Sequence, residues 1–355
     1  MKISLLIITG GKSSRLGQDK RFVEVGGVGL LENILSKAVA QNFAEIFLCV
    51  EENLPALKIL AEKFGAKLLV DEIKDAGALA GISNGLAHIK TDWALAISAD
   101  MPFFDFETMR PLTEKFSAAQ AVVPIVGGKF QPLAAFYRQE VAEIFSRELL
   151  NGQRKIFSAI KKIPHELAEL PNAEIFFNVN TRADLKLARG RAENLSRTTP
   201  IISIVAPESG TGKTAFIERL IKIFAAQKIS VGVIKSDAHG FNLDLEGKDS
   251  YKFQTAGAKS VAVVSPNAWF MIQNERENFF AVAQKMTGVD LILTESRTKN
   301  FFPTISLWRG KGAVIADEKV AAIFTSKPEK SNDIYQFDIN DFDAAEKICK
   351  FLAGF

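Results

Sequence analysis

The sequence predicts an α/β protein made of two units. Short apolar runs that suit buried parallel strands alternate along the chain with amphipathic stretches of helical period. Twice such a run leads directly into a glycine-rich loop, and the two loops differ in length and charge, so the units are not copies of one fold. Between these openings, residues 189–200 are polar and end in proline, which breaks the alternation. We expect a first domain over residues 1–190, a linker over 191–200 and a second domain over 201–355.

Length and composition agree with two globular domains. The chain has 355 residues, of which 47% are hydrophobic and 24% charged, and this excludes a disordered or fibrous protein. The net charge of +3 is too small to argue for nucleic acid or an acidic membrane surface. No apolar run reaches the roughly 18 residues that span a bilayer, and the first run lacks a cleavage-site pattern. We therefore expect a cytoplasmic protein, with Cys49 and Cys349 buried and reduced.

The individual elements follow from the same periodicity. In the first unit we expect strands over residues 3–8, 46–50, 67–70, 93–98 and 121–124, with helices over 30–41, 57–64, 79–88 and 106–116. A mixed region predicts helices over 139–150 and 155–160, a strand over 174–178 and a helix after residue 181. In the second unit we expect strands over 201–206, 231–235, 260–265 and 291–295, and a helix over 214–226.

The first glycine-rich loop spans residues 8–20 and reads Ile-Thr-Gly-Gly-Lys-Ser-Ser-Arg-Leu-Gly-Gln-Asp-Lys. Gly10 and Gly11 allow backbone N–H groups to approach a phosphate without a clash from a Cβ atom. Arg15 and Lys20 would bring two positive charges to a triphosphate. Taken alone, these residues also fit a flexible turn with solvated charges.

The order Gly-Gly-x-Ser-x-Arg-x-Gly-x-Asp-Lys resembles the signature of nucleotidyltransferases that join a nucleoside triphosphate to a phosphorylated acceptor. Its Gly-Gly pair and Asp-Lys ending are most similar to molybdenum cofactor guanylyltransferases, although Thr9 stands where that family usually has alanine. The resemblance implies a Rossmann-like nucleotidyltransferase domain. It also implies that GMP is transferred from GTP to the molybdopterin-bound molybdenum cofactor and that pyrophosphate leaves.

Later segments extend this resemblance over about the first 190 residues. Residues 77–81, Gly-Ala-Leu-Ala-Gly, are similar to a Gly-Pro-Leu-Ala-Gly turn of the family, and residues 98–102 are similar to its Asp-x-Pro segment. Each matching residue alone could be a loop or helix cap. Together they imply nucleotide contacts from Ile8, Thr9, Gly10, Gly11, Lys20, Asn53, Asp71 and Asp100, and acceptor contacts from Gln131, Pro132, Leu133, Asn178 and Asn180.

Phosphoryl transfer of this kind needs cations and positioning more than acid–base groups. Asp100 follows a predicted central strand, where open α/β sheets place their ligands. Its carboxylate could hold Mg²⁺ against the α-phosphate, or simply cap the next helix. We therefore expect the catalytic residues to be Arg15, Lys20 and Asp100.

The second glycine-rich loop matches the P-loop pattern G-x-x-x-x-G-K-S/T at every fixed position except the first, where Pro207 replaces glycine. Most of the phosphate-facing donors lie later in the loop, so we expect the anion site to survive. The residues expected to bind phosphate are Ser209, Gly210, Thr211, Gly212, Lys213 and Thr214.

Residues 201–355 resemble the adapter proteins of molybdopterin-guanine dinucleotide biosynthesis, through Lys235-Ser236-Asp237-Ala238-His239-Gly240-Phe241 and later segments such as Phe302-Pro303-Thr304-Ile305 with Arg309. The family has more histidines near residue 235, and its Glu-Gly pair is Glu295-Ser296 in this chain. We assign no metal to His239. Thr214 and Glu295 are expected to hold Mg²⁺, in a GTP-binding adapter domain with little or no hydrolysis.

Together the two resemblances imply a bifunctional fusion that makes the guanine dinucleotide form of the molybdenum cofactor, and tethering would raise the effective concentration of one domain at the other. Molybdopterin-synthesising and molybdoenzyme-maturation proteins are the implied partners. One alternative keeps the transfer chemistry but uses CTP or a sugar-phosphate acceptor. Another makes the P-loop half a non-catalytic interaction module. Nucleic-acid binding is disfavoured by the near-neutral charge.

Overall fold

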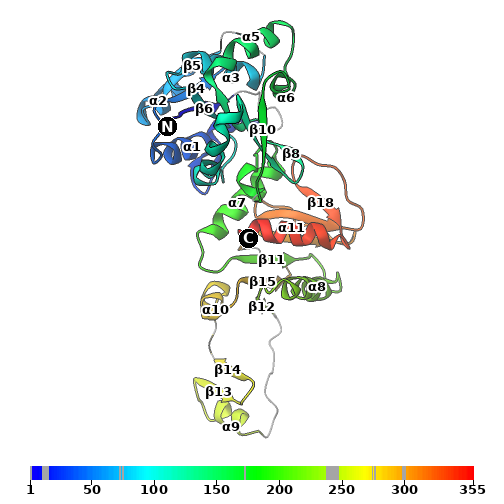
Figure 1. The fold of residues 1–355 in the computed structure, drawn as a ribbon. Coiled ribbons are helices and arrows are strands. Elements are labelled where there is room, and N and C mark those ends of the chain that lie inside the picture. The colour runs from blue at the N-terminus through cyan, green and yellow to red at the C-terminus, as the bar shows by residue number, and fades with distance from the viewer. Residues whose placement is uncertain are drawn as a thin grey trace. The chain divides into compact units, whose positions relative to one another are not determined.

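A computed structural model describes residues 2–9, 16–71, 73, 76–171, 173–236, 248–273, 275, 277–297 and 301–355. The chain divides into two compact units, Met1–Arg189 and Gly190–Phe355. Each unit is an α/β structure built on its own sheet (Figure 1). Among the described residues, no helix is both long and apolar enough to cross a membrane.

The sheet of the first unit has the strand order β10-β7-β9-β6-β1-β4-β5, with β8 paired to β7. Its neighbours are parallel except that β9 is antiparallel to β6 and β7, and β8 is antiparallel to β7. The strands are β1 (Ser4–Ile8), β4 (Ile46–Val50), β5 (Lys67–Val70), β6 (Trp93–Ser98), β7 (Ala121–Val126), β8 (Lys129–Phe130), β9 (Ala134–Arg138) and β10 (His165–Glu169).

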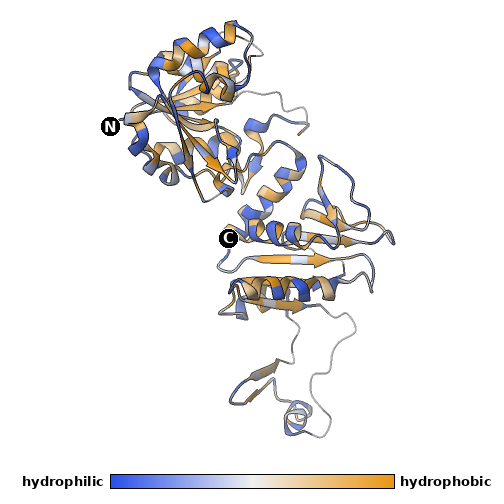
Figure 2. Cartoon of the chain, turned by 45° about the vertical axis from the view of Figure 1, so that its right-hand side comes forward, coloured by the Kyte–Doolittle hydropathy of each residue, from blue (hydrophilic) through white to orange (hydrophobic). Residues whose placement is uncertain are grey.

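Helices cover both faces of this sheet, because side chains alternate along each buried strand. Leu5 and Ile7 of β1 face one apolar cluster and Leu6 and Ile8 face another. The first cluster includes residues of α1 (Leu30–Val39), α2 (Pro55–Lys63), α4 (Phe106–Met109) and the 3₁₀ helix η2 (Arg110–Ala118). The second includes residues of α3 (Ala78–His88), α5 (Ala142–Leu150) and α6 (Ile156–Ile160). Figure 2 shows the resulting hydrophobic strands and mixed helices.

The second unit has a parallel six-stranded sheet of order β12-β15-β11-β16-β17-β18. Its strands are β11 (Ile201–Val205), β12 (Val231–Lys235), β15 (Leu291–Ser296), β16 (Thr304–Trp308), β17 (Val320–Thr325) and β18 (Tyr335–Asp338). Its helices are α8 (Lys213–Ala226), α9 (Asp249–Thr255), α10 (Phe279–Lys285) and α11 (Phe342–Ala353). The predicted strand at 260–265 is β13 (Ser260–Val264), which forms a separate antiparallel hairpin with β14 (Trp269–Gln273).

Three sequence predictions are wrong in detail. The predicted strand over 174–178 is a 3₁₀ helix, η4 (Glu174–Phe176), because β10 already occupies the edge of the sheet beside β7. The predicted helix over 106–116 is interrupted after Met109, where η2 follows with Pro111 in its first turn, since proline cannot continue an α-helix. The predicted linker over 191–200 begins too early, because α7 (Arg182–Leu195) continues through its first half.

The continuation of α7 has a local cause. Arg191 donates to the carbonyl of Phe351 at 2.6 Å, and Asn194 donates to the carbonyl of Leu352 at 3.1 Å. Both carbonyls belong to the last turn of α11. These bonds hold the end of α7 as a helix within the second unit, and only residues 196–200 remain without regular structure.

Candidate functional site

The carboxyl ends of β1 and β6 lie side by side, since Ile8 pairs with Ser98. The N–H of Ala99 donates to the carbonyl of Ile8 at 3.0 Å. Thr9 is buried, and its hydroxyl and its N–H both donate to the carbonyl of Cys49, at 2.9 and 3.1 Å. The first loop therefore begins at the edge where parallel sheets of this kind bind ligands. Gly10, Gly11 and Arg15 lie outside the described residues.

Asp100 is the centre of this edge. The residue is 4% exposed, and each of its two carboxylate oxygens has a hydrogen-bond partner. The Lys20 ammonium donates to Oδ2 at 2.8 Å, and the Ser98 hydroxyl donates to Oδ1 at 2.6 Å. The structure thus brings together two predicted catalytic residues that are 80 positions apart.

Lys20 is held in place by its own neighbours. It begins the 3₁₀ helix η1 (Lys20–Phe22), which Asp19 caps by accepting from the N–H of Arg21. The Arg21 guanidinium also donates to both oxygens of Asp19, at 2.6 to 3.0 Å. Burial alone would raise the pKa of Asp19, but these hydrogen bonds and the positive charge of Arg21 keep it below its usual value. Asp19 therefore stays ionised and fixes the start of η1.

The first predicted acceptor segment adjoins the same edge. Because β9 is antiparallel to β6, residues 131–133, which precede β9, lie at the carboxyl end of β6. The N–H of Ser98 donates to the carbonyl of Leu133 at 2.9 Å, and the buried Tyr137 hydroxyl donates to the carbonyl of Pro132 at 2.7 Å. The Gln131 side chain donates to the carbonyl of Lys129 through a long bond of 3.4 Å.

The second predicted acceptor segment, residues 178–180, adjoins Asp100 directly. The N–H of Val179 donates to the backbone carbonyl of Asp100 at 2.9 Å. The Asn178 side chain donates to the carbonyl of Phe176 at 2.9 Å, whereas Asn180 is exposed. Thr181 and Asp184 form a reciprocal cap at the start of α7, and Asp184 also accepts from the N–H of Asn180.

Asp71 and Asn53 follow neighbouring strands but differ in environment. Asp71 is 7% exposed, and its Oδ1 atom has no hydrogen-bond partner among the described residues. Burial raises the pKa of Asp71 to about 6, the nearby Glu51 adds to this, and a hydrogen bond from Asn84 opposes it. Asn53 is exposed, and no hydrogen bond joins it to the described residues around Asp100.

Sequence reasoning did not single out Ser98, which holds one oxygen of Asp100. A signal existed, because residues two apart at the end of a strand share one face. Ser98 was part of the motif that identified Asp100, but its hydroxyl was not given a role.

The P-loop of the second unit connects β11 to α8, as its spacing predicts. Gly210 and Gly212 have positive φ angles of 75° and 99°, which other residues rarely adopt. The Lys213 ammonium donates across the loop to the carbonyl of Glu208 at 3.3 Å, and the Thr211 hydroxyl donates to the same carbonyl at 2.8 Å. The Arg309 guanidinium donates to the carbonyl of Thr211 at 2.8 Å.

Thr214 and Glu295, the two residues expected to hold a metal at the P-loop, contact each other. The Thr214 hydroxyl donates to the Glu295 carboxylate, at 3.1 Å to Oε2. Burial lowers the pKa of Lys213, the negative charge of Glu295 opposes this, and the positive charges of Arg297 and Lys235 add to it. Residues of the loop and the ends of β12 and β15 therefore form one charged site. His239 lies outside the described residues.

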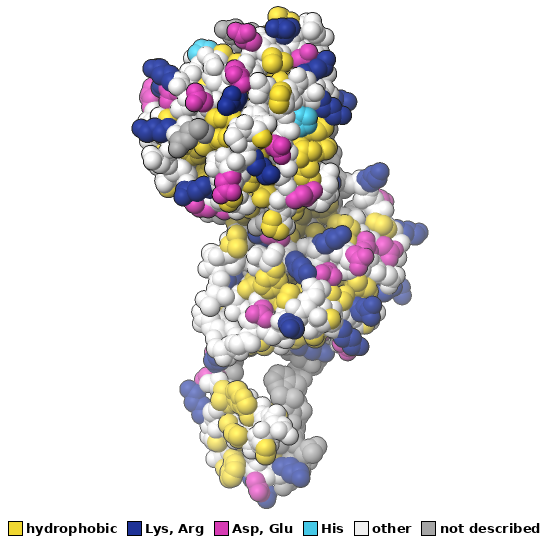
Figure 3. Space-filling view, in the orientation of Figure 1, with side chains coloured by type: hydrophobic (Ala, Val, Ile, Leu, Met, Phe, Trp, Pro, Cys, Tyr) yellow, Lys and Arg dark blue, Asp and Glu magenta, His cyan; other side chains and the backbone are white. Residues whose placement is uncertain are grey.

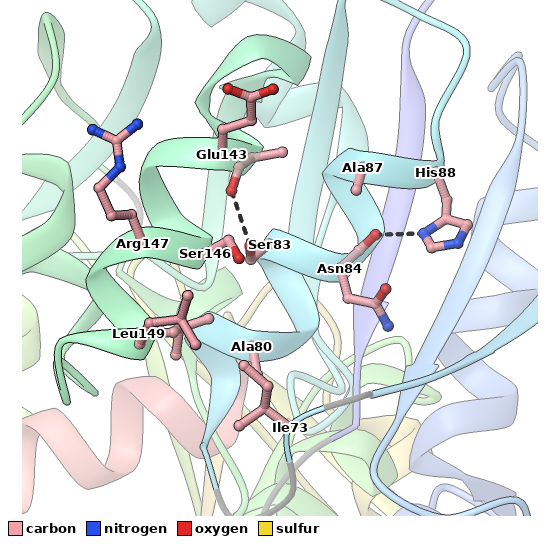
Figure 4. A pocket seen from close by; sticks show the side chains of 12 residues that line it. Ile73, Ala80, Ser83, Asn84, Ala87, His88, Glu143, Ser146, Arg147 and Leu149 are labelled. Atoms are coloured by element: carbon pink, nitrogen blue, oxygen red, sulfur yellow. Dashed lines mark hydrogen bonds between the residues drawn. The ribbon is translucent and has the colours of Figure 1, made fainter.

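A cavity of about 450 Å³ lies between α3 and α5 of the first unit (Figure 4). The Ser83 hydroxyl donates to the carbonyl of Ala142 at 3.1 Å within it, and His88 bonds the carbonyl of Asn84 at 2.9 Å. None of the residues predicted to bind nucleotide or acceptor lines this cavity. On the face shown in Figure 3, basic and acidic side chains are interspersed over both units.

Comparisons with known proteins match each unit separately. Residues 5–166 match the MobA-like NTP transferase domain, and residues 201–326 match molybdopterin guanine dinucleotide synthesis protein B. The chain is 31% identical over 194 residues to a probable molybdenum cofactor guanylyltransferase of Natronomonas pharaonis, covering 52% of this chain and 96% of the relative. It is 32% identical over 202 residues to one of Pelotomaculum thermopropionicum, covering 54% and 94%.

Solved structures give two further likenesses. Molybdopterin-guanine dinucleotide biosynthesis protein A of Archaeoglobus fulgidus is 26% identical, with a TM-score of 0.45 over 53% of this chain and 97% of that one. MobB of Bacillus subtilis is 19% identical, with a TM-score of 0.34 over 44% and 99%. On the sequence matches, the chain belongs to the molybdenum cofactor guanylyltransferase family through its first unit, and it joins to that unit a domain of the molybdopterin guanine dinucleotide synthesis protein B type.

Proposed function

We propose that the first unit transfers GMP from GTP to the molybdopterin-bound molybdenum cofactor, giving the guanine dinucleotide cofactor and pyrophosphate. The observation that carries this proposal is the buried contact of 2.8 Å between Lys20 and Asp100, at the sheet edge where the first loop begins. The contact joins a cation, which can neutralise phosphate charge, to a carboxylate, which can hold Mg²⁺. Family membership supplies the identity of the substrates.

In this reaction a phosphate oxygen of the acceptor attacks the α-phosphorus of GTP in line. A new P–O bond forms, the bond from the α-phosphorus to its bridging oxygen breaks, and pyrophosphate leaves with that electron pair. Lys20 and Arg15 would neutralise the charge that develops on the leaving oxygens. Lys20 is already fixed by η1, so little ordering is needed at the moment of reaction.

Asp100 fits the role of a Mg²⁺ ligand. Mg²⁺ in nucleotide sites is usually held by one or two carboxylates together with substrate phosphates. Among the described residues, no group of three or more acidic, His or Cys side chains could hold a metal. When bound there, Mg²⁺ would stabilise the negative charge on the phosphate oxygens.

The remaining contacts are assigned by position. We assign Asp71 to the ribose side, supported by its buried Oδ1 atom, which has no hydrogen-bond partner in the described part of the chain. We assign Asn53 to the base side. With these, Ile8, Thr9, Gly10 and Gly11 would line the nucleotide. We assign Gln131, Pro132, Leu133, Asn178 and Asn180 to the acceptor. The backbone bonds that Ser98 donates to Leu133 and Val179 donates to Asp100 support this assignment.

The second unit is proposed to bind GTP through Ser209 to Thr214, with Mg²⁺ held by Thr214 and Glu295, as an adapter with little or no hydrolysis. The bond between the Thr214 hydroxyl and Glu295 supports this metal assignment. We further propose that the protein acts in the cytoplasm beside molybdopterin-synthesising and molybdoenzyme-maturation proteins. The partner assignment rests on the matches to both families.

The test is pyrophosphate release by the purified protein with MgCl₂ and molybdenum-loaded molybdopterin. GTP, CTP and ATP are compared, and Asp100→Ala is the control. Release with GTP alone that requires the cofactor and disappears in the variant is the expected result. Release with CTP would move the protein to cytidylyl transfer, and no cofactor-dependent release with any nucleotide would refute the proposal.

A further inference from the structure

Two side chains of α1 hold the backbone that follows Asp100. Asn33 donates from Nδ2 to the carbonyl of Pro102 at 2.7 Å. Lys37 donates from Nζ to the same carbonyl at 2.9 Å and to the carbonyl of Phe104 at 3.1 Å. Asn33 and Lys37 are four residues apart on one helix, so they project from the same face. Neither belongs to the motifs that identified the candidate site.

The contact made by Lys37 differs from an ordinary contact of a surface lysine, because its side chain is partly removed from solvent. Its side chain is half-buried, and burial lowers the pKa of Lys37 although the negative charge of Asp105 opposes this. Removing an ammonium from water is costly unless hydrogen bonds replace the lost hydration. Two carbonyl acceptors do so here, and charge-assisted bonds of this kind are among the strong ones.

Lys63, a second lysine that bonds a residue of α1, is exposed and so differs from Lys37. Lys63 of α2 pairs with Glu32 of α1 at 2.6 Å, but its side chain is 57% exposed. Such exposed pairs contribute little to stability. Among the described residues, no hydrogen bond or ion pair joins Lys63 to residues 99–105, so it is a matched control for Lys37.

The backbone that is held carries the proposed metal ligand. Residues 99–105 contain no helix or strand, so no ladder of hydrogen bonds fixes them. From one side, the N–H of Val179 bonds the carbonyl of Asp100. From the other, Asn33 and Lys37 bond the carbonyls at positions 102 and 104. The segment that follows Asp100 is therefore clamped from both sides.

We propose that Asn33 and Lys37 are positioning residues for Asp100, which they fix by holding the carbonyls of Pro102 and Phe104. The inference rests on the proposed function of the first unit. A displacement of about 1 Å at a catalytic group can cost about 100-fold in rate. Loss of the clamp is expected to lower kcat and to raise the Mg²⁺ concentration needed for half-maximal rate, while leaving the KM for GTP nearly unchanged.

The experiment compares Asn33→Leu, Lys37→Met, Lys37→Arg and the control Lys63→Met in the full chain. The first readout is hydrogen exchange of the backbone amides of Met101, Phe103, Phe104 and Asp105 without nucleotide, which needs no activity. The second is kcat, KM for GTP and the Mg²⁺ dependence of pyrophosphate release. Asn33→Leu leaves Pro102 with one donor, whereas Lys37→Met leaves Phe104 with no side-chain donor, so a graded effect is expected.

The expected result is exchange about 10-fold faster and kcat about 10-fold lower in Lys37→Met, smaller changes in Asn33→Leu, partial rescue in Lys37→Arg and no change in Lys63→Met. Unchanged exchange in residues 101–105, or a kcat equal to that of Lys63→Met, would overturn the inference. If Lys37→Met does not fold, Asn33→Leu decides by the same criteria. Wild-type protein without GTP-dependent release would refute the proposed function, while the exchange readout would still decide whether the clamp exists.

Discussion

The two glycine-rich loops of this chain lead to sites that are assembled in different ways. At the first site, groups from distant parts of the chain converge, since Lys20 meets Asp100 and Val179 bonds the same residue from a third segment. At the second site, Lys213 bonds the carbonyl of Glu208 within its own loop, and Glu295 reaches Thr214 from β15. The Lys20–Asp100 pair is nearly buried, whereas the Thr214–Glu295 contact is exposed.

This difference indicates a division of labour. Convergence of a carboxylate and a cation in a water-poor position suits a group that must be fixed during chemistry. A continuous loop with its own lysine suits the binding of phosphates by one segment. Variants that affect one site and spare the other test that division.

The largest effect is expected from Asp100→Asn. The variant keeps the shape of the side chain but removes the charge that would hold Mg²⁺. Loss of a preorganised electrostatic group of this kind costs about 10² to 10³ in rate, measured as kcat for pyrophosphate release. GTP binding at the P-loop should be unchanged. A rate within threefold of wild type, which corresponds to about 0.7 kcal/mol in activation free energy, would mean that another residue is the metal ligand.

The next effect is expected from Lys213→Ala, which should weaken GTP binding at the second unit by about 10- to 100-fold. Hydrogen bonds to charged groups contribute about 1.5–3 kcal/mol, and each 1.4 kcal/mol is about tenfold in affinity. Calorimetric titration with GTP measures both sites, and the control is Lys222→Ala on the exposed side of α8. Pyrophosphate release should persist, and its loss in Lys213→Ala would contradict the division.

Alanine substitutions at two glycines, one in each unit, compare how tightly the units are packed. A Cβ atom at Gly85 would lie 2.7 and 2.8 Å from the methyl groups of Leu6, which is fully buried in β1. A Cβ atom at Gly232 would lie 2.6 Å from the terminal methyl of Met286, which can move aside. Gly85→Ala should therefore destabilise the first unit by about 1–3 kcal/mol, and Gly232→Ala the second by less than about 1 kcal/mol. Equal losses in calorimetry would contradict this.

The smallest effect concerns Asp71. Its folded-state pKa of about 6 lies above the ordinary value of 3.8. Between these two pH values Asp71 is therefore mostly protonated in the folded state and mostly ionised in the unfolded state. The associated stability is complete below about pH 4 and is lost as the pH rises through about 6. A shift of this size corresponds to about 3 kcal/mol in a dry site, and solvent screening reduces it to about 1–2 kcal/mol.

Asp71→Asn should remove this pH dependence. The variant should be more stable than wild type at pH 7–8 and equal to it near pH 4. Calorimetry measures this in the thermal unfolding transition of the first unit, which is the transition that Gly85→Ala should shift to lower temperature. Parallel stability curves for the two proteins between pH 4 and pH 8 would show that Asp71 is not held in a raised-pKa environment.

The strands β1, β4 and β6 could be predicted closely because each is a continuous apolar run that is almost wholly buried. The edge strand β5 could be predicted from its apolar residues Leu68, Leu69 and Val70, although none of them is fully buried. The antiparallel insertion of β9 could not, because its place between β6 and β7 is decided by tertiary pairing. The short apolar run at Ile175 and Phe176 resembled a strand, but it packs into the core from a 3₁₀ turn. The apolar run of β17 was available in the sequence and was missed.

The candidate site shows the same limit. Motifs indicated Lys20 and Asp100 separately, but nothing in the spacing could show that they touch across 80 residues. Asn33 and Lys37 give no sequence signal, because each reads as an ordinary polar position on an amphipathic helix. Only the packing of α1 beside residues 99–105 gives them a partner.

The most direct test of the central claim follows GTP labelled at its α-phosphate. Wild-type protein and Lys213→Ala should both transfer the label to the molybdenum cofactor in the presence of MgCl₂, and Asp100→Asn should not. That result would place the chemistry in the first unit and leave the P-loop to bind. Transfer that survives in Asp100→Asn but is lost in Lys213→Ala would contradict the account.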